Sequence, residues 1–338
     1  MDAVDPIDVV ILWVDVSDSA WQEARRDAHG ASGGTRYLGA DNEWDTLRYL
    51  LRSIEQYCPW VRRIHLVTPG QVPRWLVEDH PRISVVDQRT ILPADASPSF
   101  NSMAVEVNLD RIPGLARNFM YFNDDMLVLK PTTAADVFPH GRPAGFAIQN
   151  AITSSNDWSH WVLNAVGVVN AVFEKRRVMR LRPLQWFHPR YGRYVIRNLA
   201  LLPWGSFTGF FEPHVPMALR TDTYEQIRRQ LPELVRKTSM SRVRSLGDVS
   251  PFLYRYWQLC TGDFTPVSPD AYGRFFEMDA TSLDAVEAHL RSNRSIFVCL
   301  NDGPGADEEG VRERLHVMLD ARFPQPSSFE RRPTSQRE

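Results

Sequence analysis

One segment places acidic side chains in the middle of an otherwise apolar stretch. Residues 119–130 read FMYFNDDMLVLK, so Asn123, Asp124 and Asp125 interrupt a run of aromatic and aliphatic residues. The aromatic half predicts a buried β-strand. Two adjacent carboxylates at the end of such a strand lose much of their hydration. A cation or several hydrogen bonds must compensate for that loss.

Two interpretations of this Asn-Asp-Asp sequence are open. In the first, it forms a β-turn whose charges are solvated. In the second, the side-chain oxygens bind Mg²⁺ or Mn²⁺ at the end of an interior strand, where α/β proteins place their ligands. Such ions commonly bring a substrate diphosphate with them. The segment alone does not decide between the two interpretations.

Size, charge and the absence of targeting signals limit the classes to which the protein can belong. The chain has 338 residues, of which 43% are hydrophobic, so it can build a substantial core. Its net charge of −2 gives no general attraction for nucleic acid. No apolar run reaches the roughly 20 residues of a transmembrane helix, and the N-terminal sequence lacks signal-peptide features. The three cysteines show no metal-ligand spacing. We expect a cytoplasmic protein, at most peripherally associated with membrane machinery.

The first half of the chain alternates between strand and helix patterns. Continuous β-branched runs predict buried strands at residues 7–14, 63–68 and 83–87, and leucines at helical spacing predict a helix over 45–57. This alternation predicts an α/β fold with a doubly wound, mostly parallel, Rossmann-like sheet. We expect this part to occupy residues 1–150.

The second half has a different composition. Residues 151–212 are rich in Trp and Arg, which predicts a partly helical insertion that covers the ligand edge of the sheet. Residues 213–323 are expected to be largely helical, with a returning strand at 295–300 (SIFVCL). Residues 324–338 are expected to form a frayed tail.

Carboxylates follow three of the predicted apolar strands. They are Asp15 and Asp18, Asp124 and Asp125, and Asp302. A turn or a helix cap explains a single acidic strand end. Because the carboxyl ends of parallel strands share one edge of a sheet, three such ends favour one common site for a cation and a phosphate.

Further residues have both a functional and a purely structural interpretation. Arg48 and Arg52 lie one helical turn apart and can clamp a diphosphate, although for Arg52, beside Glu55, we favour a solvated helix face. Asn101 and Ser102 suit the N-terminal cap of the next helix. A helix N-terminus that points to the same sheet edge also favours an anion.

One histidine lies in a constrained loop. His214 stands between Pro213 and Pro216, within the sequence FFEPHVP. Most single histidines are structural or exposed. A neutral imidazole near a phosphate can nevertheless take a proton from an acceptor hydroxyl, because its pKa lies near the working pH. His160 and His188 lie in less rigid surroundings and are weaker candidates.

Four blocks together resemble the Stealth family of sugar-1-phosphate transferases. This family includes bacterial capsular and exopolysaccharide phosphotransferases and the catalytic subunit of the lysosomal-enzyme N-acetylglucosamine-1-phosphotransferase. The similar blocks are IDVVILWVDVSD (7–18), residues 36–130 with YFNDDM, residues 214–262, and IFVCLNDG (296–303) extending to FPQPSSFE (323–330).

The chain departs from the family pattern at three positions. Val16 replaces the usual Gly after the first strand, and Gly303 stands where many relatives have a second Asp. Glu43 occupies a position that is usually Asp. Metal binding by the last strand therefore depends on Asp302, with Asn301 beside it.

The resemblance implies a reaction and its partners. A sugar-1-phosphate, foremost an N-acetylhexosamine-1-phosphate, is transferred from a UDP-sugar to a hydroxyl of a glycan or oligosaccharide acceptor, and UMP is released. UDP-N-acetylglucosamine is the first choice of donor, in capsular or exopolysaccharide synthesis. Attack at the β-phosphorus leaves the bond between the sugar C1 and its oxygen intact.

This reaction assigns roles to the candidate residues. We expect Mg²⁺ or Mn²⁺ to be bound by Asp124, Asp125, Asn301 and Asp302. We expect the UDP-sugar to be bound by Trp13, Asp15, Ser17, Asp18, Asn101 and Ser102. Arg48 is expected to neutralise phosphate charge. His214 is the expected base, with Glu43 as the alternative base, as an orienting group or as a second ligand.

Two other functions remain open. A metal-dependent glycosyltransferase would use the same strand-end carboxylates but attack C1 of the sugar and release UDP. A non-catalytic sugar-binding protein would account for the departures at Val16 and Gly303.

Overall fold

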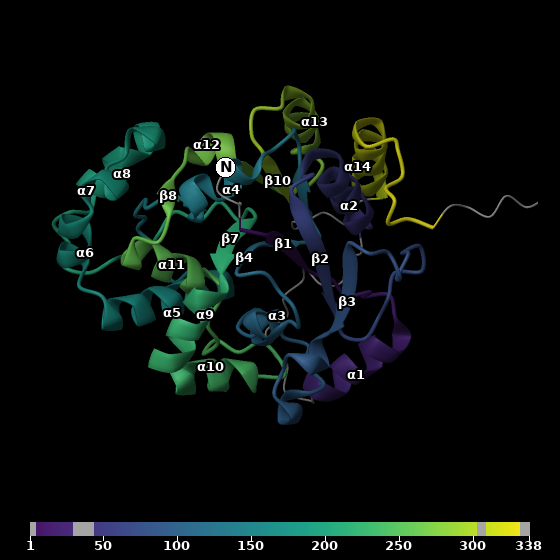
Figure 1. Cartoon of the computed structure of the whole chain (residues 1–338), viewed down its shortest axis with the longest axis horizontal. Coiled ribbons are helices and arrows are strands. Elements are labelled where there is room, and N and C mark those ends of the chain that lie inside the picture. The colour runs from purple at the N-terminus through teal and green to yellow at the C-terminus, as the bar shows by residue number, and fades with distance from the viewer. Residues whose placement is uncertain (1–4, 30–43, 303–308, 332–338) are drawn as a thin grey trace, which may run out of the picture.

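The computed structural model describes residues 5–29, 44–302 and 309–331 (Figure 1). Glu43 and Gly303, which the sequence singled out, lie outside these ranges. Helices flank a central sheet, and the predicted α/β fold is confirmed.

The central sheet has the strand order β3-β2-β1-β4-β7. Its strands are β1 (Ile7–Leu12), β2 (Val61–Thr68), β3 (Ile83–Asp87), β4 (Asn118–Asn123) and β7 (Met217–Arg220). The first four are parallel, and β7 pairs antiparallel with β4 at one edge. Strand β1 pairs with β2 on one side and with β4 on the other. The chain therefore adds β2 and β3 on one side of β1 and then returns to add β4 on the other side, so the strand order reverses between β1 and β4.

Alternating side chains of the central strands enter two separate cores. In β1, Val9 and Ile11 pack into one core, whereas Val10 packs into the other. Leu50 of α2 (Thr46–Tyr57) belongs to the first core, and Ala104 of α3 (Ser102–Glu106) belongs to the second. Because strand side chains alternate with a period of two and β1 has apolar residues on both faces, the strand must be covered on both faces.

The remaining helices surround these two cores. They are α1 (Ser19–His29), α4 (Ala134–Val137), α5 (Asp157–Val172), α6 (Lys175–Leu181), α7 (Pro183–Trp186), α8 (Val195–Ala200), α9 (Thr221–Gln230), α10 (Pro232–Ser239), α11 (Phe252–Thr261), α12 (Pro269–Tyr272), α13 (Leu283–Ser292) and α14 (Glu309–Arg322). Among the described residues, no helix combines the length and the apolarity that a membrane span requires.

The returning strand joins a second sheet. Strand β10 (Phe297–Asp302) pairs antiparallel with β5 (Met126–Val128) and parallel with β9 (Gly273–Met278). Strand β10 therefore lies outside the central parallel sheet. Its end nevertheless reaches β4, because only Asp124 and Asp125 separate β4 from β5. The Leu300 N–H donates to the Asp125 carbonyl oxygen at 2.9 Å.

Two small features complete the chain. Strands β6 (Ala144–Gly145) and β8 (Thr265–Pro266) form a short parallel pair. The segment 151–212 contains α5 to α8, so its predicted helical content is confirmed. Figure 1 shows α6, α7 and α8 along the edge of the molecule opposite α2 and α14.

The expected frayed tail is ordered through residue 331. Phe329 is fully buried, and Glu330 forms a β-bridge with Leu76. Arg52 Nε and Nη2 donate to the two carboxylate oxygens of Glu330 at 2.7 and 2.8 Å. The side chain of Arg52 is only 10% exposed, so its assignment to a solvated helix face is also wrong. A buried two-point ion pair ties α2 to the end of the described chain.

Candidate active site

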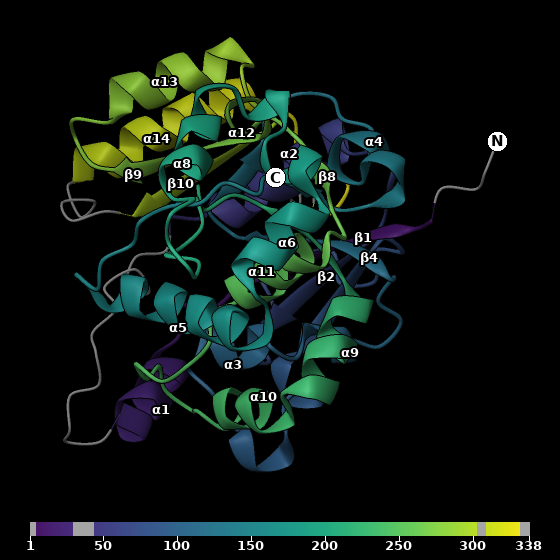
Figure 2. The same cartoon turned by 90° about the vertical axis from the view of Figure 1, so that its left-hand side faces the viewer.

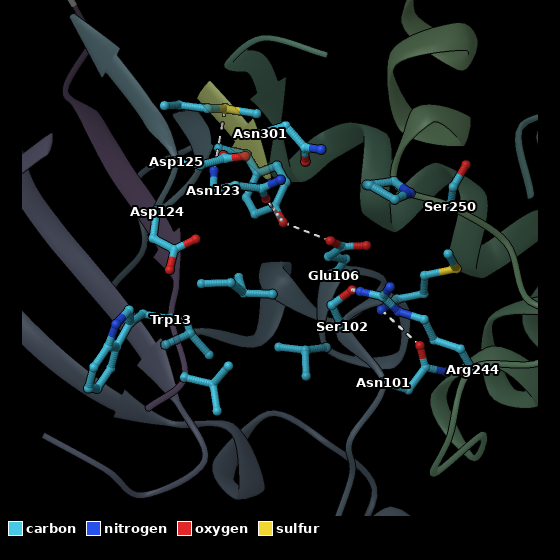
Figure 3. Close-up of a pocket in the computed structure, with 18 of the residues that line it drawn as sticks. Trp13, Asn101, Ser102, Glu106, Asn123, Asp124, Asp125, Arg244, Ser250 and Asn301 are labelled. Carbon is cyan, nitrogen blue, oxygen red and sulfur yellow. Dashed lines mark hydrogen bonds between the residues drawn. The ribbon is translucent and has the colours of Figure 1, made fainter. Parts of the chain in front are cut away.

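A cavity of about 330 Å³ lies at the carboxyl ends of β1 and β4. This is the point where the strand order reverses, the usual ligand position in open α/β sheets. Figure 3 shows Trp13 and Asp124 on one side of the cavity and Asn101, Ser102 and Arg244 on the other. One side of the lining therefore carries the carboxylate of Asp124, and the other carries the guanidinium of Arg244.

All four predicted metal ligands line this cavity. They are Asp124, Asp125, Asn301 and Asp302. The first two come from the turn between β4 and β5, and the last two end β10. Their oxygens are the hard donors that Mg²⁺ and Mn²⁺ prefer. The structure thus brings together residues that lie about half the chain apart.

The Asp125 carboxylate has an unsatisfied oxygen. Its Oδ2 accepts a hydrogen bond from the Cys299 thiol at 3.3 Å, whereas its buried Oδ1 has no hydrogen-bond partner among the described residues. Burial raises the pKa of Asp125, and the nearby His214 opposes that shift. Ligand atoms of Asp125, His214 and Cys299 lie within 4.8 Å of one another. A cation bound at this position would supply the partner that the buried oxygen of Asp125 lacks.

His214 reaches the cavity from a tightly held loop. Its backbone has a positive φ of 47°, and its ring contacts Phe275 edge-on at 5.8 Å between centroids. Two residues earlier, Glu212 accepts a hydrogen bond from Arg255 Nη1 at 2.8 Å, and both side chains are buried. Burial lowers the pKa of His214, although Asp125 opposes the shift. At neutral pH the imidazole is therefore uncharged and able to accept a proton.

A chain of hydrogen bonds runs from α3 to this histidine. The Tyr121 hydroxyl lies 2.7 Å from Glu106 Oε1 and 2.9 Å from Asn123 Oδ1. The amide nitrogen of Asn123 lies 3.4 Å from His214 Nε2. Burial raises the pKa of Glu106 and favours its protonated form. The Tyr121 hydroxyl donates to Glu106 Oε1 and also lies within hydrogen-bonding distance of Asn123 Oδ1, so the amide nitrogen of Asn123 is the atom that faces His214.

The predicted helix cap is confirmed. Asn101 Oδ1 accepts a hydrogen bond from the Met103 N–H at 3.1 Å, at the start of α3. Its amide nitrogen donates to Asp248 Oδ2 at 2.9 Å. Asn101 and Ser102 both line the cavity, as the sequence predicted. Asn101 therefore positions α3 and at the same time forms part of the cavity wall.

Arg244 lies at the cavity, and Arg48 does not. Arg244 Nη2 donates to Ser102 Oγ at 2.9 Å, and its guanidinium lies over the Trp161 ring. Arg48 is absent from the cavity lining; it lies 3.9 Å from Glu330 and stacks over Trp75. The sequence-based assignment of Arg48 to a phosphate is not supported by this placement. Helical spacing predicted the helix correctly but not the direction in which Arg48 points.

The carboxylates that follow β1 form a turn and a helix cap. Asp15 Oδ1 accepts hydrogen bonds from the N–H and the hydroxyl of Ser17 at 2.9 and 2.6 Å. Asp18 Oδ1 accepts from the Ala20 N–H at 2.9 Å at the start of α1. None of these three predicted ligand residues lines the cavity, whereas Trp13 does. The acidic ends of β4 and β10 therefore meet in the cavity, whereas the end of β1 contributes the indole ring of Trp13 and no carboxylate.

Sequence reasoning missed Glu106, Arg244 and Cys299 as members of this site. Glu106 carried a signal, because its segment SMAVE places a carboxylate among apolar residues. Arg244 lies in a loop between α10 and α11, where no periodicity marks it. Cys299 resembles any other residue of a buried strand.

Comparisons with known proteins agree on one family. Three Stealth models match this chain: conserved region 1 at residues 5–33, conserved region 2 at 40–144 and conserved region 4 at 288–338. The first two matches include Trp13 and the Asn-Asp-Asp turn, and the third includes Asn301 and Asp302. The matched regions therefore converge on the cavity.

Whole-length relatives extend this similarity. The exopolysaccharide phosphotransferase cps2G of Lactiplantibacillus plantarum is 34% identical, with 96% of each chain covered. The receptor polysaccharide phosphotransferase WefC of Streptococcus gordonii is 31% identical, covering 97% of this chain and 99% of WefC. The capsular polysaccharide phosphotransferase WcwK of Streptococcus pneumoniae is 27% identical, covering 98% of this chain and all of WcwK. Our protein is therefore a transferase that belongs to the Stealth family.

Proposed function

We propose that the protein transfers an N-acetylhexosamine-1-phosphate from a UDP-sugar to a hydroxyl of a glycan acceptor and releases UMP. The relatives that resemble it along their whole length are phosphotransferases of bacterial surface polysaccharides, which supports sugar-phosphate transfer in polysaccharide synthesis. The observation that carries the proposal is the meeting of Asp125, His214 and the acidic end of β10 in one cavity.

The donor diphosphate would lie between the two sides of the cavity. Asp124, Asp125, Asn301 and Asp302 would hold Mg²⁺ or Mn²⁺, which when bound neutralises diphosphate charge. Arg244 would stabilise the negative charge that develops on the transferred phosphoryl group, because a guanidinium donates two parallel hydrogen bonds. The indole of Trp13 would stack on a flat part of the donor.

The acceptor hydroxyl would be deprotonated by His214. Its oxygen forms a bond to the β-phosphorus, the bond from that phosphorus to the bridging oxygen breaks, and UMP leaves with the bridging oxygen. The proton passes to His214 Nε2, where the hydroxyl replaces the long contact with Asn123. Trp158 and Trp161 of α5 line the same cavity and would stack against acceptor sugar rings.

The released nucleotide tests this reaction directly. We expect purified protein with Mg²⁺, UDP-N-acetylglucosamine and an oligosaccharide acceptor to release UMP, identified by mass spectrometry. The acceptor should gain the mass of a sugar phosphate. Release of UDP would identify a glycosyltransferase, and an unchanged donor across a panel of UDP-sugars would favour a non-catalytic sugar-binding protein.

Asp125→Asn tests the metal site. We expect turnover to fall on the order of 100-fold, because the carboxamide cannot supply the charge that a divalent cation requires. Thermal stability should be retained or rise, since the substitution removes a buried charge. The stabilisation of the wild-type protein by Mg²⁺ in a thermal melt should disappear. Asp15→Asn is the matched control outside the cavity, and near-normal turnover of Asp125→Asn would remove the metal assignment.

A pair of arginine substitutions separates the two candidate cations. We expect Arg244→Gln to lower kcat about 100-fold to 1000-fold, the usual effect of removing a group that stabilises transition-state charge. Arg48→Gln should change kcat less than about threefold, because Arg48 lies outside the cavity lining. Steady-state kinetics measures both effects. The reverse order of the two losses would restore the sequence-based assignment of Arg48.

The pH dependence of turnover tests His214 as the base. Because burial lowers its pKa below the ordinary 6.5, the neutral form should prevail at neutral pH, and kcat should decline only as the pH falls below about 6.5. His214→Gln should lower kcat on the order of 100-fold or more and abolish this acidic limb, with UDP-sugar affinity largely kept. A variant that keeps the limb and only weakens donor binding would make His214 a ligand contact.

A further inference from the structure

The insertion carries most of the exposed large apolar side chains of the described chain. Nine such side chains exist among the described residues, and seven of them fall within residues 172–204. Those seven are Val172, Leu181, Leu184, Ile196, Leu199, Leu202 and Trp204. Leu184 is 80% exposed and Ile196 is 67% exposed. Such a concentration on one short segment marks an interaction surface.

The same segment is strongly basic. Residues 172–204 contain eight lysines and arginines but only one acid, Glu174, a net charge of +7 in a chain whose total is −2. Arg176, Arg177 and Arg180 are exposed and form no salt bridge with any described residue. This local excess of positive charge is complementary to an anionic surface.

The surface is held in place by internal hydrogen bonds. The buried Lys175 of α6 donates from Nζ to the carbonyl oxygens of Leu201 and Trp204, the latter at 3.0 Å. Asn198 of α8 accepts from the Gln149 N–H and donates to the Ala147 carbonyl oxygen, both at 2.7 Å. The apolar side chains therefore project from a fixed scaffold.

The three helices lie together at one extremity of the molecule. In Figure 1, α6, α7 and α8 form the outermost edge, away from α14. In the view turned onto that edge, α6 and α8 both face the reader (Figure 2). We call this surface the α6–α8 face and define it by residues 176–204.

We propose that the α6–α8 face binds an anionic lipid membrane at its interface. Leu181, Leu184 and Ile196 would enter the boundary between headgroups and acyl chains, while the arginines contact lipid phosphates. This combination of bulky apolar and basic side chains is typical of proteins that lie on a membrane surface without crossing it.

Other occupants account for only part of the surface. A nucleic acid or an anionic polysaccharide would satisfy the arginines but would gain nothing from a leucine that is 80% exposed. A symmetric contact with a second copy would bring two strongly basic surfaces together, and like charges repel. A membrane with acidic headgroups satisfies both the charged and the apolar side chains.

Membrane binding by the α6–α8 face is independent of the proposed reaction. The α6–α8 face lies on the insertion whose helix α5 contributes Trp158 and Trp161 to the cavity wall. A protein held by this face would act on acceptors located at the membrane surface. Turnover of a soluble donor would not require the lipid.

Vesicle sedimentation with the full chain tests the proposal. We expect binding to vesicles of phosphatidylcholine with about 30% phosphatidylglycerol, at least tenfold tighter than to phosphatidylcholine alone, and weaker at high salt. Leu184→Ser/Ile196→Ser should reduce binding about tenfold or more, and so should Arg177→Gln/Arg180→Gln. Nucleotide release from a soluble UDP-sugar should stay unchanged in both variants.

A matched control comes from α14. Val317 is 69% exposed, and Arg312 on the same helix is exposed as well, so Val317→Ser/Arg312→Gln removes comparable side chains at a distant place. We expect this variant to bind vesicles within twofold of wild type. Absence of binding to anionic vesicles, or an equal loss in the control, would overturn the proposal. So would a wild-type dimer in analytical ultracentrifugation that Leu184→Ser/Ile196→Ser dissociates.

Discussion

The candidate site depends on how the chain crosses from one sheet into the other. Strand β4 ends at Asn123 and β5 begins at Met126, so Asp124 and Asp125 form the whole connection. With both neighbours fixed in separate sheets, neither carboxylate can move far from the junction. The hydrogen bond from the Leu300 N–H to the Asp125 carbonyl oxygen then brings the end of β10 to the same place. One short connection thus positions acids from two distant parts of the sequence.

Burial at this junction favours uncharged forms of several groups at once. It raises the pKa of Asp125, of Glu106 and of the Cys299 thiol, and it lowers the pKa of His214. The protonated Cys299 thiol donates to Asp125 Oδ2, and the Tyr121 hydroxyl donates to Glu106 Oε1. A cation that binds Asp125 would reverse this preference for the carboxylate, because a nearby positive charge favours the ionised form. Exclusion of water from the site is therefore the main cause of these four pKa shifts.

Sequence reasoning identified the elements with strong periodicity and failed where orientation decides. The apolar runs of β1 and β4 and the leucines of α2 follow directly from alternation and helical spacing. The pairing of β10 with β5 and β9 could not be predicted, because the sequence of a buried strand is the same whichever sheet the strand joins. Asp15 and Asp18 resembled Asp124 and Asp125 in sequence, yet only backbone geometry separates a cap from a cavity wall. For the same reason the pattern could not show that Arg244 lines the cavity and Arg48 does not.

The left-handed backbone of His214 has a thermodynamic consequence. A non-glycine residue with a φ of 47° is destabilised by about 1–3 kcal/mol, and surrounding contacts must hold it there. The buried pair of Glu212 and Arg255 supplies such contacts two residues away. Relaxation of the loop to an ordinary conformation would stabilise the chain locally but would give up the backbone conformation in which His214 and Asp125 lie within 4.8 Å of each other. The fold thus tolerates a less stable backbone conformation at His214, and the imidazole ring stays close to Asp125 and Cys299.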